Sequence, residues 1–165
     1  MKTNTRVPHP LRPSAIGIDI GRVLIAGDGA DTSFLGHDED RAMRAPEMPG
    51  AIESITRLVE AFDGRVWLVS KCGPRVEART RKWLVGKRFF ERTGMSERNL
   101  RFCRERRDKA PIAVDLGLDR FVDDRADVLR AMRGLVPRLV LFGAATAEPG
   151  MSAAPDWRRA LPLLL

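Results

Sequence analysis

Short hydrophobic runs alternate with longer amphipathic segments along most of the chain. The hydrophobic runs cover residues 15–18, 66–69, 100–103, 120–122 and 139–142. Apolar runs of this length, bounded by turn residues, are typical of buried strands. We therefore expect five strands.

Between these runs, hydrophobic residues recur at helical spacing. The clearest helix follows Pro49-Gly50, where apolar residues from Ile52 to Phe62 share one face. Weaker patterns predict further helices over residues 76–84, 109–116 and 128–132. Strands that alternate with helices favour an α/β domain with a parallel sheet. We predict a doubly wound, Rossmann-like, three-layer domain, with five parallel strands in the order 3-2-1-4-5 and the first strand central.

Two segments do not follow this pattern. Residues 1–13 contain three prolines and predict an irregular lead-in, which leaves residues 14–165 as a single domain. Residues 26–46 are polar and acidic and contain three glycines, so they predict a loop. Within that loop, the cluster from His37 to Asp40 resembles a set of metal ligands, but we interpret it as solvated.

Composition narrows the class of protein. The 165 residues suit one domain, and the hydrophobic fraction of 44% argues against global disorder. The net charge of +7 favours anionic partners. Two cysteines are too few for a disulfide scaffold, and neither a signal-peptide pattern nor a membrane-length apolar run is present. These features predict a cytoplasmic protein that makes no contact with a membrane.

Reactive polar residues follow three of the predicted strands. Asp19 ends the first, Ser70 ends the second, and Asp123-Asp124 ends the fourth. Ligands of open parallel sheets bind beyond the carboxyl ends of the strands, so these side chains should meet there. Lys109 begins the helix before the fourth strand and should reach the same edge.

This set of residues suits phosphoryl transfer. A carboxylate can attack phosphorus and form an aspartyl-phosphate. Mg²⁺ binds oxygen ligands and uses one or two carboxylates together with phosphate. Lys109 and the Ser70 hydroxyl are suited to hold phosphoryl oxygens. Lys71, beside Ser70, is a further candidate for phosphate, with a surface role as the alternative.

The order of these residues resembles the four motifs of haloacid dehalogenase (HAD)-like hydrolases. The motifs stand in the segments GIDIGRVL, VWLVSK, RRDKAP and FVDDRADV, and the resemblance covers residues 14–145. Within the superfamily, the sequence is similar to the 5'(3')-deoxyribonucleotidase-like branch. The resemblance implies that Asp19 is the nucleophile and that Lys109 takes part in catalysis. The implied Mg²⁺ ligands are Asp19, the backbone carbonyl of Gly21, Asp123 and Asp124. The implied phosphoryl-binding residues are Ser70 and Lys109.

The sequence departs from the family pattern at two places. Phosphatases of the family usually have a second Asp two residues after the nucleophile as general acid and base, and here that position is Gly21. A positioned acid or base contributes about 10²–10⁴ in rate. Nucleotidases of this branch also insert a helical cap after the first motif, whereas only about twenty residues separate Leu24 from Pro46. The site is therefore expected to lack a cap domain.

Two functions of different classes follow. The first is a Mg²⁺-dependent phosphatase that acts on a phosphomonoester, either a phosphorylated small molecule or a nucleotide. The second is a catalytically impaired phosphate-binding or partner-binding module, with a protein partner over an open site. Nucleic acid is disfavoured because the basic run from Arg98 to Lys109 has one aromatic residue. A phospho-acceptor receiver domain is also disfavoured, because its acidic pair would precede the acceptor Asp.

Overall fold

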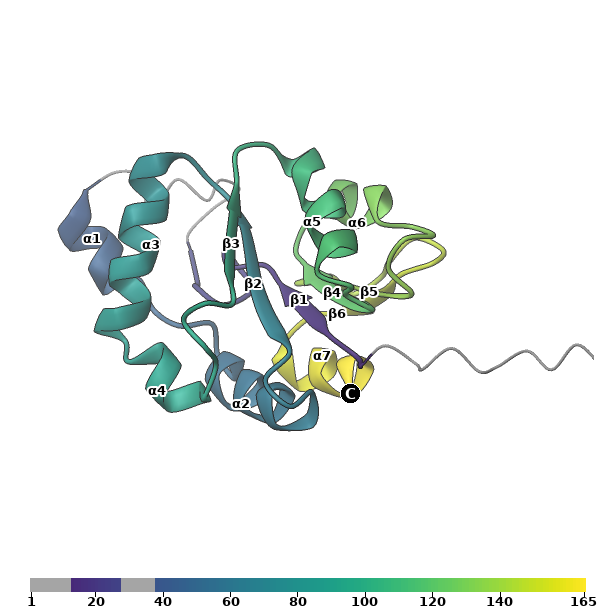
Figure 1. The fold of residues 1–165 in the computed structure, drawn as a ribbon, viewed down its shortest axis with the longest axis horizontal. Coiled ribbons are helices and arrows are strands. Elements are labelled where there is room, and N and C mark those ends of the chain that lie inside the picture. The colour runs from purple at the N-terminus through teal and green to yellow at the C-terminus, as the bar shows by residue number, and fades with distance from the viewer. Residues whose placement is uncertain (1–12, 28–37) are drawn as a thin grey trace, which may run out of the picture.

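A parallel sheet forms the centre of the molecule in the computed structural model, which describes residues 13–27 and 38–165 (Figure 1). Its six strands have the order β3-β2-β1-β4-β5-β6, and every pairing is parallel. The strands are β1 (Ile16–Ile18), β2 (Val66–Lys71), β3 (Leu100–Cys103), β4 (Arg120–Asp123), β5 (Arg138–Phe142) and β6 (Ser152–Ala154). All five predicted strands form, and β1 lies between β2 and β4. Of the predicted lead-in over residues 1–13, all but the last residue lies outside the described residues.

Helices cover both faces of this sheet. They are α1 (Glu39–Arg44), α2 (Ala51–Ala61), α3 (Pro74–Gly86), α4 (Phe89–Thr93), α5 (Lys109–Asp115), α6 (Ala126–Ala131) and α7 (Trp157–Leu164). Figure 1 shows α5 and α6 on one side of the sheet and α2 and α7 on the other. Within residues 13–27 and 38–165, no helix has the length and apolar character needed to cross a membrane.

The strands bury alternate side chains in two separate hydrophobic clusters. Val122 of β4 belongs to the cluster that contains α2 and α7, whereas its neighbour Phe121 belongs to the cluster that contains α5 and α6. This alternation is expected because successive strand residues point to opposite faces. Gly17 of β1 lies directly opposite Phe121, and a Cβ atom there would lie 2.5 Å from the Phe121 ring. The central strand therefore requires glycine at this position.

The five-stranded prediction is wrong by one strand. β6 adds to the edge of β5, with Val140 opposite Ser152. Its three residues are small, so it lacks the large hydrophobic side chains that each of the other strands contains. The strand forms because the edge of β5 offers unpaired backbone groups, a tertiary effect that side-chain pattern does not report.

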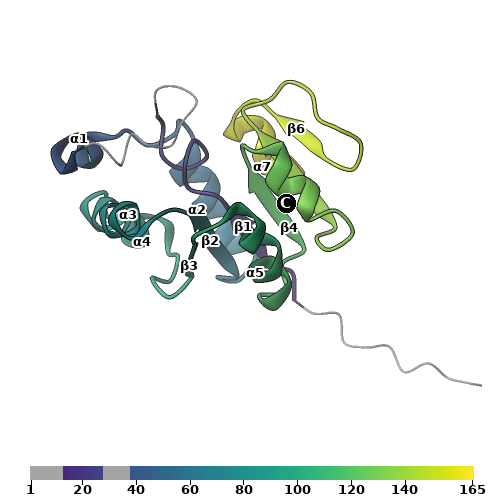
Figure 2. The same cartoon turned by 90° about the horizontal axis from the view of Figure 1, so that it is seen from above.

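The predicted loop over residues 26–46 is also wrong in part, because residues 39–44 form α1. Asp38 is the N-cap of this helix and accepts a hydrogen bond from the Arg41 N–H at 2.6 Å, and Glu39 forms an ion pair with Lys82. The acidic residues at positions 38–40 therefore start a helix, as carboxylates favour helix N-termini. Figures 1 and 2 both place α1 beside α3, at the end of the molecule away from β6. Residue 37 lies outside the described part of the chain.

Candidate active site

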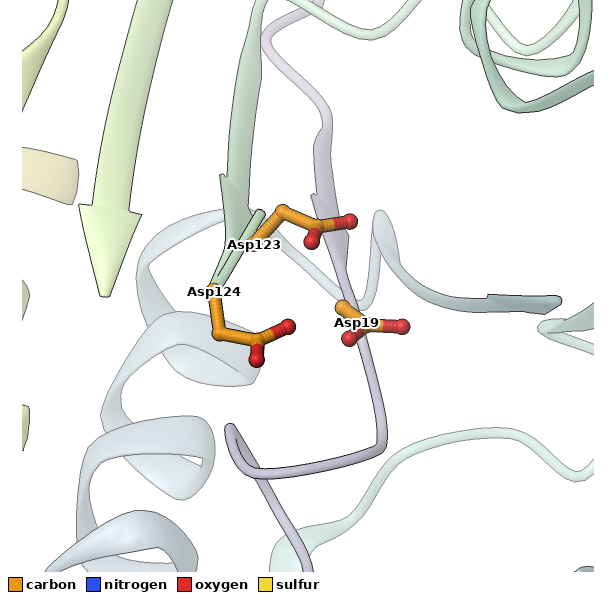
Figure 3. Close-up of side chains that lie close together, drawn as sticks. All are labelled: Asp19, Asp123 and Asp124. Atoms are coloured by element: carbon orange, nitrogen blue, oxygen red, sulfur yellow. The ribbon is translucent and has the colours of Figure 1, made fainter. Parts of the chain in front are cut away.

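Three carboxylates gather where β1 and β4 end. Ile18 is paired with Val122, so Asp19 and Asp123 come next on neighbouring strands. The Asp19 N–H donates to the Val122 carbonyl at 3.0 Å and fixes this register. One carboxylate oxygen from each of Asp19, Asp123 and Asp124 lies within 4.8 Å of the others (Figure 3). Parallel pairing thus brings together residues more than one hundred positions apart.

Lys109 lies between two of these carboxylates. Its Nζ donates to Asp19 Oδ1 at 2.7 Å and to Asp123 Oδ2 at 2.8 Å. The Lys109 side chain is 3% exposed, and those of Asp19 and Asp123 are 9% and 0% exposed. Asp123 also accepts a hydrogen bond from the Arg125 N–H at 3.0 Å. Lys109 is therefore a fixed, buried counter-charge.

The three carboxylates outnumber the single ammonium of Lys109, and the pKa values of Asp123, Asp124 and Lys109 are raised as a result of their surroundings. Burial, followed by the negative charge of Asp19, raises the pKa of the Asp123 carboxyl well above its usual range. Burial and Asp19 likewise raise the pKa of Asp124. Burial alone would lower the pKa of Lys109, but the two carboxylates that it contacts more than offset burial and raise it. The cluster therefore favours additional positive charge.

The donor set fits a hard divalent cation. Its members are oxygen donors from carboxylates, and the cysteines and histidines that suit zinc are absent from the described cluster. Of the metal ligands predicted from sequence, Asp19, Asp123 and Asp124 do come together. The fourth, the backbone carbonyl of Gly21, belongs to the turn that follows Asp19.

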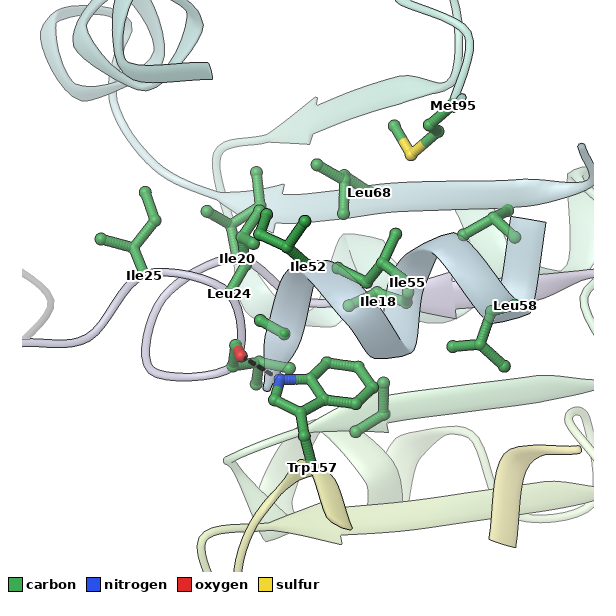
Figure 4. Close-up of a cluster of buried hydrophobic side chains, with 14 of the residues drawn as sticks. Ile18, Ile20, Leu24, Ile25, Ile52, Ile55, Leu58, Leu68, Met95 and Trp157 are labelled. Atoms are coloured by element: carbon green, nitrogen blue, oxygen red, sulfur yellow. Dashed lines mark hydrogen bonds between the residues drawn. The ribbon is translucent and has the colours of Figure 1, made fainter. Parts of the chain in front are cut away.

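That turn is held by its own backbone and by the hydrophobic core. The Arg22 N–H donates to the Ile25 carbonyl at 2.8 Å, and the Ile25 N–H donates to the Ile20 carbonyl at 3.0 Å. From α7, the Trp157 Nε1–H donates to the Val23 carbonyl at 2.7 Å (Figure 4). Trp157 is fully buried, so the turn is tied to α7 within the hydrophobic core.

Arg22 is a residue of the site that sequence reasoning missed. Its Nη1 lies 3.7 Å from Asp124 Oδ2. It is also the left-handed residue of the turn, with φ +61°, whereas Gly21 is not among the residues with positive φ. The signal available in the sequence was a charged residue three positions after Asp19.

Ser70 and Lys71 are the last residues of β2 and reach the same edge of the sheet. Ser70 is buried and Lys71 is exposed. Lys71 lines a cavity of about 420 Å³, which is bounded by residues 104–107 and by Asp127, Val128 and Ala131 of α6. Four basic side chains face two acidic ones in this lining, so the cavity favours an anionic ligand.

Several arginines of the basic run 98–109 have partners within the fold. Arg101 lies over the Trp67 ring with its Cζ 4.5 Å from the centroid. Arg104 donates to Glu77 at 2.8 Å, and Arg107 forms an ion pair with Glu105. These contacts reduce the charge that this run offers to a polyanion.

The two cysteines do not form a disulfide. Both thiols are free and buried at the ends of neighbouring strands, and the Cys72 N–H donates to the Cys103 carbonyl at 3.0 Å. Burial raises the pKa of the Cys72 thiol to about 11. A thiol of this kind is unreactive at neutral pH, because the thiolate is the nucleophile.

Comparison with known proteins identifies the fold. No family model matches the chain, and no curated protein matches its sequence. Solved structures with this fold include a HAD-superfamily hydrolase from Ehrlichia chaffeensis, with a TM-score of 0.59 and 9% identity over 92% of this chain and 96% of that one. A HAD family hydrolase from Deinococcus radiodurans R1, with bound phosphate and sodium, has a TM-score of 0.52 and 14% identity over 92% and 88%. The chain thus has the α/β fold of HAD-superfamily hydrolases, which confirms the fold that the motif order implied.

Proposed function

We propose that this protein is a Mg²⁺-dependent phosphatase that hydrolyses a phosphomonoester through an aspartyl-phosphate at Asp19. The observation that carries the proposal is the buried ammonium of Lys109, held between Asp19 and Asp123 with Asp124 alongside. A buried ion cluster of this kind is costly for stability, and such clusters concentrate at functional sites. The structural relative with bound phosphate and sodium supports the same reading.

The chemistry assigned to Asp19 is nucleophilic. A carboxylate oxygen attacks phosphorus, a new O–P bond forms, and the bond from phosphorus to the leaving oxygen breaks. Gly21 has no side chain to protonate that oxygen, so the leaving group takes its proton from water. Water then attacks phosphorus of the acyl phosphate, which releases phosphate and restores the Asp19 carboxylate. Lys109 orients Asp19 throughout and neutralises charge.

The metal-binding role falls to Asp19, Asp123, Asp124 and the carbonyl of Gly21. Bound Mg²⁺ supplies the positive charge that allows one anion to approach another. Ser70 and Lys71 are assigned to the phosphoryl group, at the carboxyl end of β2. The anionic preference of the cavity beside Lys71 supports a phosphorylated small molecule or a nucleotide as substrate.

We further propose that the protein is related to the 5'(3')-deoxyribonucleotidase-like branch and that it lacks a cap domain. The connection between the Arg22 turn and α2 supports a site without a cap, because its described part holds only the six-residue α1, packed against α3. The cytoplasm is the compartment we propose, since both thiols are free.

A phosphate-binding or partner-binding module is the second candidate. Gly21 is the observation that favours it, because the usual general acid and base is missing. This candidate predicts binding of Mg²⁺ and phosphate with no turnover.

Hydrolysis of 4-nitrophenyl phosphate separates the two candidates. We expect phosphate release that requires Mg²⁺, stops on addition of EDTA and is abolished in Asp19→Asn. Asp115→Asn, an exposed carboxylate of α5, is the matched control and should retain activity. A folded wild type that binds Mg²⁺ and phosphate but hydrolyses neither aryl nor alkyl phosphates would favour the module.

A further inference from the structure

Arg22 combines two unfavourable features in one residue. Its backbone is left-handed, with φ +61°, in a region that residues other than glycine rarely adopt. Its Nε and Nη2 atoms are buried and have no hydrogen-bond partner among the described residues. Buried donors of a charged group are almost always satisfied, so an unsatisfied pair calls for an explanation.

The left-handed backbone at this position would suit glycine, yet the residue is arginine. Gly21 is adjacent and would adopt a left-handed conformation without strain. Within residues 13–27 and 38–165, Arg88, at the start of α4, is the other left-handed arginine, with φ +53°, but its side chain is 73% exposed and pairs with Glu91. Arg88 is therefore solvated and paired, whereas Arg22 is strained and keeps two side-chain donors, Nε and Nη2, without a partner in the described part of the chain.

The two unpartnered nitrogens form one recognition edge. In a guanidinium group, Nε–H and one N–H of Nη2 point in parallel, and this pair binds two oxygens of a phosphate or carboxylate. Nη1 of Arg22 lies 3.7 Å from Asp124 Oδ2, so Nε and Nη2 are the donors that remain without a partner among the residues that the structure describes. Arg120 provides a contrast: its Nε is also unpartnered, but its Nη1 lies 2.8 Å from Asp119 and its Cζ lies 4.9 Å from the Phe62 ring centroid.

We infer that Arg22 is an anion-binding residue of this site, whose Nε–H and Nη2–H groups bind two oxygens of the phosphoryl group of the substrate. The inference deepens the proposed function and rests on it for the identity of the anion. A phosphoryl dianion suits the site because Lys109 already contacts two carboxylates, so a guanidinium adds positive charge to that of Lys71 and the metal ion. Arg22 supplies fixed positive charge in the same turn where Gly21 offers no proton.

Binding of inorganic phosphate at saturating Mg²⁺, followed by calorimetry, tests this role without turnover. Arg22→Gly removes the paired Nε–H and Nη2–H donors and relieves the left-handed strain of the backbone. We expect phosphate affinity to fall about 10- to 100-fold, the value of charge-assisted hydrogen bonds. The thermal midpoint should stay equal or rise. Arg22→Lys keeps the positive charge but lacks the paired guanidinium donors, so its phosphate affinity should lie between those of Arg22→Gly and the wild type.

Arg88→Gly is the matched control, because it makes the same backbone change at an exposed site. It should leave phosphate affinity unchanged. Wild-type phosphate affinity in a folded Arg22→Gly protein that binds Mg²⁺ normally would overturn the inference, as would full recovery in Arg22→Lys. A wild type that binds phosphate through Arg22 but never hydrolyses an ester would refute the phosphatase and leave the Arg22 assignment standing.

Discussion

Replacement of Lys109 by methionine tests the charge balance of the site most directly. The substitution keeps an unbranched side chain but removes the ammonium that contacts Asp19 at 2.7 Å and Asp123 at 2.8 Å. Both carboxylates are at least nine-tenths buried and would lose their counter-charge. Breaking a buried ion pair in this way costs about 3–5 kcal/mol. With a urea dependence of about 2 kcal/mol/M, the midpoint of unfolding should fall by about 1.5–2.5 M.

The stability lost in Lys109→Met should depend on pH and on Mg²⁺, and the direction of each dependence follows from the buried carboxylates. Burial and Asp19 raise the pKa of the Asp123 carboxyl, so its protonated form stabilises the folded state at low pH, and that stability is lost as the pH rises through the raised pKa. The deficit of Lys109→Met should therefore be small near pH 5 and grow toward pH 8. Mg²⁺ should stabilise the variant more than the wild type, because it replaces the missing charge.

Urea unfolding at pH 5 and pH 8, with EDTA or Mg²⁺, measures these effects. Lys82→Met is the control, since Lys82 forms an exposed pair with Glu39 and should leave the midpoint unchanged. A deficit below about 1 kcal/mol at pH 8 without metal, far short of the cost of a broken buried pair, would refute the idea that Lys109 neutralises a buried acidic cluster.

Four substitutions and one chemical modification have further defined outcomes. Gly21→Asp should raise turnover of alkyl phosphates by up to about 10²-fold in a phosphatase assay, because it restores a proton donor at a position without positive φ; unchanged turnover in a folded protein would mean that the missing acid is not limiting. Asp123→Ala should show a clear loss of Mg²⁺ affinity by calorimetry, and equal affinity would contradict the metal site. Gly17→Ala should lower stability by about 1–3 kcal/mol through overpacking, while Gly86→Ala, in open space at the end of a helix, should raise it by up to about 1 kcal/mol in thermal unfolding. Cys72, with its pKa raised to about 11 by burial, should resist iodoacetamide at pH 8 until urea is added, as mass spectrometry would show; its stabilising contribution should be lost as the pH rises from about 9 through 11.

The sequence predicted those elements of the fold in which the spacing of hydrophobic side chains identifies a strand or a helix. The central strands carry buried apolar residues such as Ile16, Ile18, Phe121 and Val122, and α2 has a single hydrophobic face from Ile52 to Val59. The site followed from the same logic, since Asp19, Asp123 and Lys109 stand at ends of such elements. Parallel strands bring these ends to one edge of the sheet, whatever the intervening sequence.

The parts that sequence missed depend on contacts between distant residues. β6 forms because β5 leaves an open edge, and α1 is held by contacts with α3, including the Trp83 Nε1–H bond to the Ala45 carbonyl at 2.8 Å. Arg22 was missed because what distinguishes it is a left-handed φ angle and two side-chain nitrogens without hydrogen-bond partners in the described residues. Composition and residue spacing do not report either feature.

The hydrogen bond from Trp157 to Val23 also orders events during protein synthesis. Its two residues are 134 positions apart, so a ribosome that adds about 5–20 residues per second completes the turn on the order of 10 s before its tether exists. Before that interval ends, the nascent chain contains every acidic and basic residue of the site. A message truncated before the codon for Trp157 would therefore encode all of the proposed chemistry but not this tether of the turn that carries Arg22.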